Sequence, residues 1–343
     1  MEENSKTRMV AYGHCASIYI VLSDLIHDRQ VNKMSVSMPS VSDVVKKKKA
    51  HTWRDIRKHK TIYLFISPFY ILFAVFGLFP ILFSLFLSFQ AWNGLDRMKF
   101  IGLENFALLM GDGVFWQSVL NTFIIWLEST IPMLFIALVL AFILNSALVK
   151  LRGFWRFAFF LPNVTSIVAE AIIFGSLFAT QYGLVNNVLH FFGIPPIDWL
   201  NNNVWLQIGI AIMIIWRWTG YNTIIYLAGL QSLPYELYEA AKVDGASMAR
   251  IFFSITLPLM RPIILFTVIM STIGGMQVFT EPQILTGGNG GPGQGGLTIV
   301  LYLYNQAFNN YLFGYGSAIA WVLFVIILIF SLLNTLIVNR LSK

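Results

Sequence analysis

Long apolar runs separated by short polar segments dominate the pattern of this 343-residue chain. The six runs lie at about 62–89, 119–144, 157–180, 204–230, 263–280 and 317–338. A helix rises about 1.5 Å per residue, so each run is close to or above the length that crosses a hydrocarbon layer of about 30 Å. The pattern therefore predicts an all-α membrane protein with six transmembrane helices. The fifth run is the shortest, and its pair Gly274 and Gly275 predicts a break or a close helix contact.

The composition supports a membrane protein and excludes several kinds of site. Hydrophobic residues make up 57% of the chain and charged residues 11%, whereas soluble proteins have about 25% charged residues. Cys15 is the single cysteine, so the sequence offers no disulfide framework and no cysteine-based metal site. The five histidines are scattered and suggest no metal cluster.

The distribution of positive charge predicts the orientation, because Lys and Arg accumulate in short cytoplasmic loops. With the amino terminus inside, sixteen Lys and Arg residues are cytoplasmic, in segments 46–60, 145–156, 231–262 and 339–343. The outer loops contain Arg97 and Lys99. We therefore expect a multi-pass protein of the cell (inner or plasma) membrane with both termini in the cytoplasm. The net charge of +7 is explained by this topology and needs no nucleic-acid partner.

The chain divides by composition into four segments. Residues 1–45 predict a disordered tail or upstream sequence from an overcalled start, since their one apolar stretch is too short to span a membrane. A basic cytoplasmic segment follows at 46–61, then the transmembrane domain at 62–338 and a cytoplasmic tail at 339–343.

Two outer loops have distinctive sequences. The first, 90–118, contains an amphipathic stretch at 103–110 that we expect on the external surface. The third contains TGGNGGPGQGGLT at 286–298, which is too rich in glycine for regular structure. Its composition predicts a flexible surface loop, and contact with an external partner is the alternative.

The cytoplasmic stretch between the fourth and fifth runs is longer than the other loops and reads LPYELYEAAKVDGASMARIFFSITLPLMRP. Apolar spacing predicts short helices at 235–243 and 247–255, with Gly245 at a sharp turn between them. Pro234 can start the first helix, and we expect Pro258 and Pro262 to end the second.

This stretch resembles the EAA loop of binding-protein-dependent ABC importer permeases. The matching residues are Glu239, Ala240, Ala241, Asp244, Gly245, Ala246, Ile255, Leu257 and Pro258, with Tyr238 beside them. In that family the loop is the coupling helix, which sits in a groove of the ATPase subunit. Small side chains at Ala240 and Ala241 would leave a smooth surface, and Glu239 could pair with a basic group of the partner. The alternative is an amphipathic loop at the membrane surface.

The resemblance extends from about residue 60 to 338 and is closest to sugar and glycerol-phosphate importers of the maltose-permease type. A second motif, at 280–321, is similar to the first of the two permeases of such importers. Its residues are Thr298, Tyr304, Ala307, Phe308, Gly314, Tyr315 and Gly316. The resemblance implies a heterodimer with a paralogous permease, two ATPase subunits that bind ATP and Mg, and an extracytoplasmic solute-binding protein. The chain has no G-x-x-x-x-G-K-[ST], H-E-x-x-H or G-x-S-x-G motif, so we expect no bound cofactor and no enzyme activity.

Polar residues inside the apolar runs are the candidates for solute contact. Glu128, Glu170 and Arg217 are charged, and an intramembrane ion pair among them is geometrically allowed, either to fix packing or to serve the substrate. A sugar site combines aromatic faces with amide and carboxylate groups. The candidate residues of the path are Trp216, Arg217, Trp218, Tyr221, Asn222, Gln277, Thr280, Glu281 and Asn121.

Together these features predict a permease that imports a mono- or oligosaccharide, driven by a separate ATPase. Glycerol phosphate or another polar solute is the alternative within the same class. A secondary transporter or channel, with Glu170 and Arg217 as an ion relay, is the alternative from another class.

Overall fold

The computed structural model describes residues 58–146 and 149–341, in two units, Met1–Ala74 and Val75–Lys343, that are treated separately. The expected tail at 1–45, most of the basic segment at 46–61 and residues 342–343 lie outside the described residues. In the first unit, α3 (Lys60–Phe73) is an apolar helix that contains Pro68. A π-helical turn, η1 (Ala74–Leu78), and α4 (Phe79–Leu87) continue the same helical stretch.

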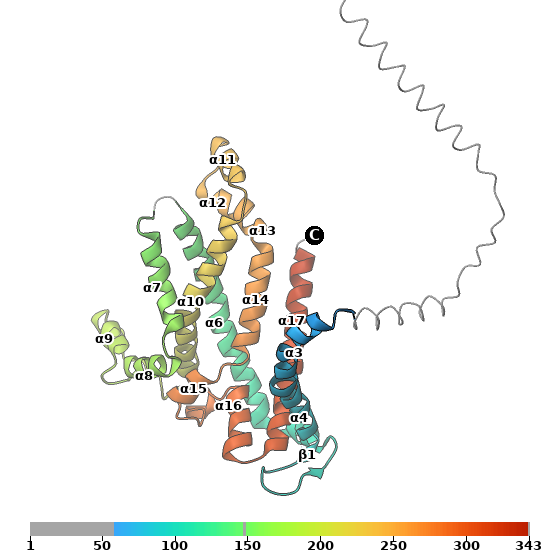
Figure 1. Cartoon of the computed structure of the whole chain (residues 1–343). Helices are drawn as coiled ribbons and strands as arrows, with labels where there is room; N and C mark the ends of the chain where they lie inside the picture. The colour runs from blue at the N-terminus through green and yellow to red at the C-terminus, as the bar shows by residue number, and fades with distance from the viewer. Residues whose placement is uncertain (1–57, 147–148, 342–343) are drawn as a thin grey trace, which may run out of the picture. The chain divides into compact units, whose positions relative to one another are not determined.

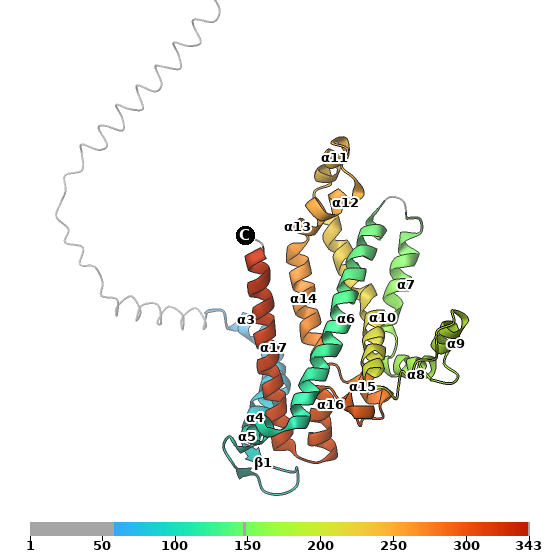
Figure 2. The same cartoon turned by 180° about the vertical axis from the view of Figure 1, so that it is seen from behind.

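In the second unit, the principal helices run side by side (Figures 1 and 2). They are α6 (Gly113–Asn145), α7 (Arg152–Val164), α10 (Asn203–Gln231), α14 (Arg261–Gly275) and α17 (Phe313–Leu341). Helix α10 packs along α6 and α7, and α14 packs against α6 and α17. Asp112 and Asn202 begin α6 and α10, because each side chain accepts hydrogen bonds from two backbone N–H groups of the first turn.

Short elements occupy the two ends of this helical layer (Figure 1). One end has β1 (Gln90–Ala91), β2 (Lys99–Phe100), α5 (Glu104–Gly111), α15 (Thr280–Leu285), η3 (Pro292–Gln294), α16 (Ile299–Tyr304) and η4 (Asn305–Asn309). The opposite end has α11 (Tyr235–Val243), α12 (Met248–Ile251), η2 (Phe252–Thr256) and α13 (Leu257–Leu259). The described strands form one two-stranded antiparallel pair, so the all-α prediction is confirmed.

Within the described residues, five helical stretches are long and apolar enough to cross a membrane, and a bent pair makes a sixth. The five are Lys60–Leu87, Gly113–Asn145, Asn203–Gln231, Arg261–Leu285 and Phe313–Leu336. The predicted number of spans is confirmed when the bent pair is counted as one. The second span begins at Gly113 and not at 119, because Asp112 caps the helix there.

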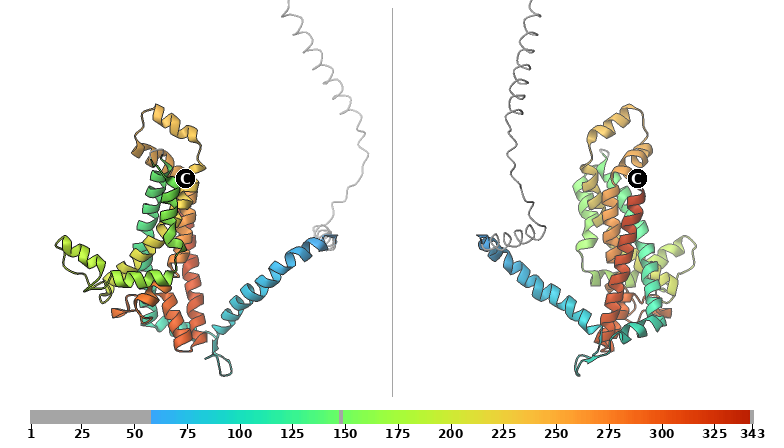
Figure 3. Two further views of the ribbon diagram at one scale, coloured as in Figure 1. Left: turned by 60° about the vertical axis from the view of Figure 1, so that its left-hand side comes forward. Right: turned by 90° about the vertical axis from the view of Figure 1, so that its right-hand side faces the viewer.

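The third span was predicted as one continuous run at 157–180, and this is wrong. Helix α7 ends at Val164, and α8 (Ile167–Leu177) leaves at 94° from it (Figure 3). Thr165 has extended backbone angles, so the helix ends after Val164, two residues beyond Pro162. A further helix, α9 (Leu184–Phe191), follows α8.

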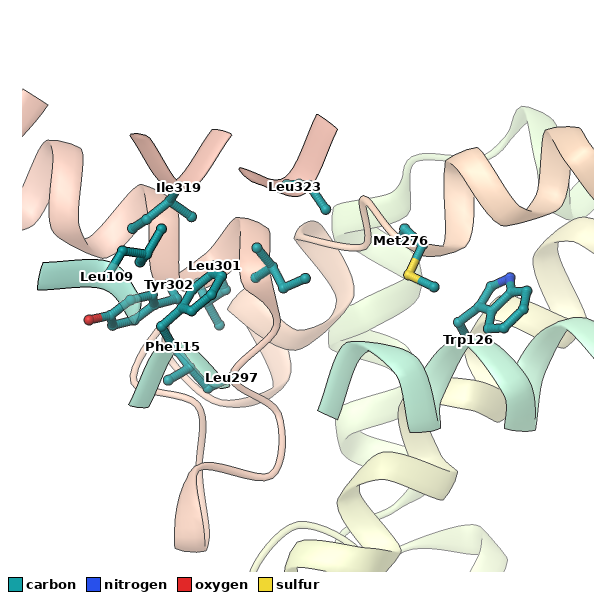
Figure 4. Close-up of a cluster of buried hydrophobic side chains, with 10 residues drawn as sticks. Leu109, Phe115, Trp126, Met276, Leu297, Leu301, Tyr302, Ile319 and Leu323 are labelled. Carbon is teal, nitrogen blue, oxygen red and sulfur yellow. The ribbon is translucent and has the colours of Figure 1, made fainter. Parts of the chain in front are cut away.

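Three groups of buried apolar side chains hold the second unit together. The first joins α5, α6, α16 and α17 around Phe115, Leu301, Tyr302 and Ile319 (Figure 4). The second joins α6, α10 and α14 through residues that include Ala137, Ala141, Tyr226, Leu230 and Met260. The third consists of Ile125, Leu206, Ile210, Ile214 and Val278. Helix α6 contributes to all three groups and is therefore the central helix of the unit.

Candidate functional site

A cavity of about 450 Å³ lies among α6, α8, α10, α14 and α15, a size typical of small-molecule sites. Its wall on α10 is formed by Trp218, Tyr221, Asn222 and Ile225. These positions fall on one face of a helix because their spacing is three, four and seven residues. The rings of Trp218 and Tyr221 meet edge to face, 5.6 Å between centroids. They form an aromatic corner in the cavity wall.

The opposite wall comes from α14 and the turn that follows it. Its residues are Phe266, Thr267, Met270, Ser271, Ile273, Gly274, Gly275, Gln277, Val278, Phe279, Thr280 and Glu281. The helix ends at Gly275, where an added Cβ would lie 2.5 Å from Cδ1 of Trp126. The glycine pair predicted a break or a close helix contact, and both are present. The break brings Gln277, Thr280 and Glu281 to the cavity.

Six of the nine residues predicted for the path line this cavity: Trp218, Tyr221, Asn222, Gln277, Thr280 and Glu281. Trp216 does not, because it lies two positions from Trp218 on α10 and packs edge-on against Phe174 instead. Other lining residues, such as Thr130, Met133 and Ile167, were not singled out from the sequence. Their ordinary side chains give no signal apart from the helix packing that places them there.

Arg217 and Glu170 form an ion pair, with 2.7 Å between Nη1 and Oε2. The guanidinium also donates to the backbone carbonyls of Thr165 (3.2 Å) and Asn163 (3.3 Å). These carbonyls belong to the broken end of α7, where no further helical turn can satisfy them. Arg217 therefore stabilises the bend between α7 and α8 by satisfying these carbonyls. Thr165 also donates its hydroxyl to the other oxygen of Glu170.

Glu128 does not join this pair, contrary to one of the groupings that the sequence allowed. It lies on α6, and its Oε2 is buried without a hydrogen-bond partner among the described residues. Glu128 is also absent from the cavity lining.

Asn121, the weaker candidate for the path, has other contacts in the structure. Its side-chain amide donates to the carbonyls of Gln294 (2.7 Å) and Leu297 (3.2 Å), and its oxygen accepts from Gln207. Gln207 also donates to the carbonyl of Gly295. Asn121 is thus part of the anchor of the glycine-rich segment and lies outside the cavity lining.

The expectation of a flexible surface loop at 286–298 is also wrong. Residues 295–298 are buried, and the carbonyls of 293–295 receive hydrogen bonds from α6 and α10. Glycine is required because the packing is close: a Cβ on Gly295 would lie 1.6 Å from the side-chain oxygen of Asn203. The segment is a packed cover over the ends of these two helices.

The segment between α10 and α14 contains the predicted sharp turn at Gly245, which is called the elbow below. Helix α11 ends at Val243, and Gly245 follows with φ +71°. The N–H of Gly245 donates to Lys242 (3.0 Å) and the N–H of Ala246 donates to Ala241 (2.9 Å). This pair of bonds is a Schellman motif, which requires a left-handed residue at the position of Gly245.

The second half of the segment differs from the prediction. Ser247 caps α12, but the helix does not end at Pro258; it passes through the π-helical turn η2 into α13 and ends at Leu259. Pro258 is the second residue of α13 and directly follows the π-helical turn η2, where the regular α-helical hydrogen bonding is already interrupted. Pro262 stands in the first turn of α14, so the chain turns at Met260.

Burial divides the motif residues into two sets. Ala241 is buried (8% exposed), and the hydroxyl of Tyr238 lies 3.2 Å from that of Thr256, so these residues hold α11 against the following helices. Glu239 and Ala240 are exposed. The smooth surface expected from both alanines is therefore formed by Ala240 and not by Ala241. Large apolar side chains beside it are also exposed: Leu237, Val243 (87%) and Met248.

Comparison with known proteins places these features in a family. Residues 105–343 match the family described as the inner membrane component of binding-protein-dependent transport systems. The chain belongs to this family. It is a multi-pass membrane protein, and its relatives are transport permeases.

Individual relatives and structures agree with this assignment. The chain is 42% identical over 275 residues to the lactose transport system permease protein LacF of Rhizobium radiobacter, covering 79% of this chain and 92% of that protein. It is 38% identical over 305 residues to the arabinooligosaccharides transport system permease protein AraP of Bacillus subtilis, covering 87% and 96%. Its fold is similar to a chain of the bacterial alginate ABC transporter crystallised with a pentasaccharide-bound periplasmic protein, with TM-score 0.73, 24% identity and coverage of 85% and 98%.

The permease has one further polar network, at the start of α6, that sequence analysis missed. The hydroxyls of Tyr302 and Tyr315 both donate to Asp112, which also caps α6. Partial burial opposes ionisation of Asp112, but the hydrogen bonds outweigh it and hold the pKa below its ordinary value. Burial and the neighbouring carboxylate raise the pKa of Tyr302 to about 12. Gly314 lets α17 approach closely here, because a Cβ would lie 1.9 Å from the carbonyl oxygen of Gln90.

Proposed function

We propose that this permease imports a mono- or oligosaccharide, delivered by an extracytoplasmic solute-binding protein, and is driven by a separate ATPase. The cavity lined by Trp218 and Tyr221 carries the proposal. Aromatic rings pack against the apolar faces of a sugar, and the amides of Asn222 and Gln277 can bond its hydroxyls. Relatives whose names state lactose and arabinooligosaccharides support sugar as the substrate class.

The segment between α10 and α14, residues 232–260, is the proposed docking site for the ATPase and is called the coupling segment below. Its exposed face combines Leu237, Ala240, Val243 and Met248 with the carboxylate of Glu239, a mixture that suits a groove with a basic rim. A rigid turn at Gly245 would present this face in one orientation. ATP and Mg would be bound by the ATPase subunits and not by this chain, whose sequence has no phosphate-binding loop.

The proposed assembly contains a paralogous permease and two ATPase subunits. Residues 280–321, which resemble the first permease of such pairs, support the heterodimer. The proposed orientation places both termini and the coupling segment in the cytoplasm, because sixteen Lys and Arg residues then lie inside. The end of the helical layer that bears α5, α15 and α16 would face the solute-binding protein.

The alternatives receive less support from the contacts. An ion relay through Glu170 and Arg217 would need a guanidinium that is free to exchange partners. That guanidinium is instead bonded to one carboxylate and to the carbonyls at the end of α7. Glycerol phosphate would need a cationic group in the cavity, and the lining residues include no Lys, Arg or His.

Two tryptophans of α10 provide a matched test. Trp218 lines the cavity and Trp216 does not, although their exposed fractions are similar, 39% and 45%. In cells that carry the complete transporter, Trp218→Ala is expected to lower uptake of its sugar by about tenfold, the value of one lost aromatic contact. Trp216→Ala is expected to leave uptake within about twofold, since it removes only a packing contact with Phe174.

The measurement is uptake of radiolabelled lactose, maltotriose, arabinotriose and glycerol 3-phosphate, with the amount of inserted permease determined for each variant. Equal effects of the two substitutions would remove the cavity as the solute site. Uptake of glycerol 3-phosphate without uptake of any sugar would replace the proposed substrate class.

A further inference from the structure

The cavity lining contains an acidic side chain but no basic one. Of the side chains that line it, Glu281 is the one carboxylate, and no Lys, Arg or His accompanies it. The other polar groups are the hydroxyls, indole and amides of residues such as Trp218, Tyr221, Asn222 and Gln277. A solute in this cavity would therefore meet a negative charge and neutral hydrogen-bonding groups.

Arg217, the cation on α10, cannot neutralise the charge of an anionic solute beside Glu281. Arg217 is already paired with Glu170 and donates to two carbonyls at the end of α7, so its donors are largely taken. Its side chain is 14% exposed, and it does not line the cavity. Drawing it toward a solute would leave Glu170, 4% exposed, without its partner, which is strongly unfavourable.

Glu281 is held where it can act on a solute. It stands in the first turn of α15, which packs against α8 and α10, and its side chain is buried. Neither Arg217 nor Glu170 lines the cavity, so Glu281 is the acidic side chain that a solute would meet there.

We propose that Glu281 determines the charge selectivity of the permease, so that the cavity accepts uncharged sugars and rejects anionic ones. This inference rests on the proposed function as a sugar permease and specifies its substrate class further. Sugar hydroxyls can donate to the carboxylate, whereas an acidic sugar would place a second negative charge beside it with no free cation nearby. Such like-charge contact in a site shielded from water lowers affinity and is an effective means of rejecting a wrong ligand.

Two trisaccharides of similar length separate charge from shape: maltotriose, which is neutral, and trigalacturonate, which carries carboxylates. The full chain in lipid nanodiscs is mixed with each, and the dissociation constant is measured by saturation-transfer NMR, which detects weak binding. Wild-type permease is expected to bind trigalacturonate at least about tenfold more weakly than maltotriose.

The variants test whether Glu281 is the cause. Glu281→Gln keeps the size and removes the charge, so the preference for maltotriose should fall below about threefold, while maltotriose affinity changes by less than about threefold. Glu281→Asp keeps the charge and should keep the preference, which controls for damage to packing. Glu128→Gln is the matched control, because Glu128 is an intramembrane carboxylate outside the cavity lining and its removal should not alter the preference.

Equal binding of the two trisaccharides to wild-type permease would overturn the inference, as would an unchanged preference in Glu281→Gln. If wild-type permease bound neither trisaccharide, and cells with the complete transporter took up none of lactose, maltotriose and arabinotriose, the proposed sugar function would itself fail. The two failures are therefore distinguishable. Unfolding temperatures of all variants are recorded, and equal binding of the two trisaccharides to wild-type permease overturns the inference even if Glu281→Gln proves unstable.

Discussion

Replacement of Gly245 by valine should uncouple the permease from its proposed ATPase. Gly245 has φ +71°, and a Cβ at this position would meet no atom within 4 Å, so the cost of valine comes from the backbone and not from a clash. A side chain in the left-handed region costs about 1–2 kcal/mol, and a β-branched one stands at the upper end. Leaving that region would break the two hydrogen bonds of the Schellman motif, each worth about 0.5–1.5 kcal/mol.

The two costs are similar in size, so the elbow would open in a large fraction of the molecules. Opening would displace the exposed face of α11, which is held to the following helices by few contacts, Ala241 and the Tyr238 hydroxyl among them. The helical layer should be unaffected, because none of its buried clusters includes a residue of α11. We expect sugar uptake to fall at least tenfold, with membrane insertion unchanged.

Gly193 provides a matched control for this experiment. It follows α9 with φ +73°, and a Cβ there also meets nothing within 4 Å. Gly193→Val should therefore carry the same backbone cost without reaching the coupling segment. The assays are co-purification of the ATPase subunit with the permease, and sugar uptake in cells. Normal ATPase recruitment and uptake in Gly245→Val would refute the coupling assignment, and equal losses in both variants would show that backbone strain alone is responsible.

Other predictions test the charged contacts. Glu239→Lys should prevent co-purification of the ATPase while the permease remains inserted, because like charges would meet at the docking surface; retained co-purification would contradict this. Arg217→Ala or Glu170→Ala alone should destabilise the fold by about 3–5 kcal/mol, and the double variant by less than the sum, measured as unfolding in nanodiscs; additive losses would exclude coupling. Asp112→Asn should lower the unfolding temperature at pH 7. The pKa of Asp112 is lowered in the folded state, so its contribution is present above the ordinary carboxyl pKa of about 4 and lost as the pH falls through the folded value. The difference from wild type should therefore shrink in acid, and a difference that is constant with pH would contradict it.

The sequence was sufficient for the helical architecture because apolar runs of membrane length have few structural alternatives. It also predicted the elbow at Gly245, since a glycine between two helical patterns marks a left-handed turn. The six predicted path residues that line the cavity lie close together on α10 and after the end of α14, where the helical period and the glycine pair place them.

The errors have a common physical origin in contacts between distant segments. The bend after α7 depends on Arg217, about fifty positions away, which satisfies the carbonyls that the break exposes. The order of the glycine-rich segment depends on Asn121 and Gln207 from two other helices. Likewise, the sequence around Asp112 does not indicate that its carboxylate accepts hydrogen bonds from the hydroxyls of two distant tyrosines. Polar side chains with long-range partners cannot be assigned from periodicity, because the pattern records only which face of a helix they occupy.

The position of the coupling segment in the chain suggests how its movement could reach the cavity. It connects α10 directly to α14, and these helices carry the two principal cavity walls. They touch close to the segment: the hydroxyls of Tyr226 and Thr267 lie 2.6 Å apart, and a Cβ on Gly229 would lie 2.3 Å from Ile263. A displacement that the docked ATPase imposed on the ends of α10 and α14, and not on α11 alone, would shift the aromatic corner of Trp218 relative to the turn that carries Glu281, because close-packed helices move as rigid bodies. In the proposed importer, the ATPase would thus alter solute contacts through two helices and would need no longer pathway through the protein.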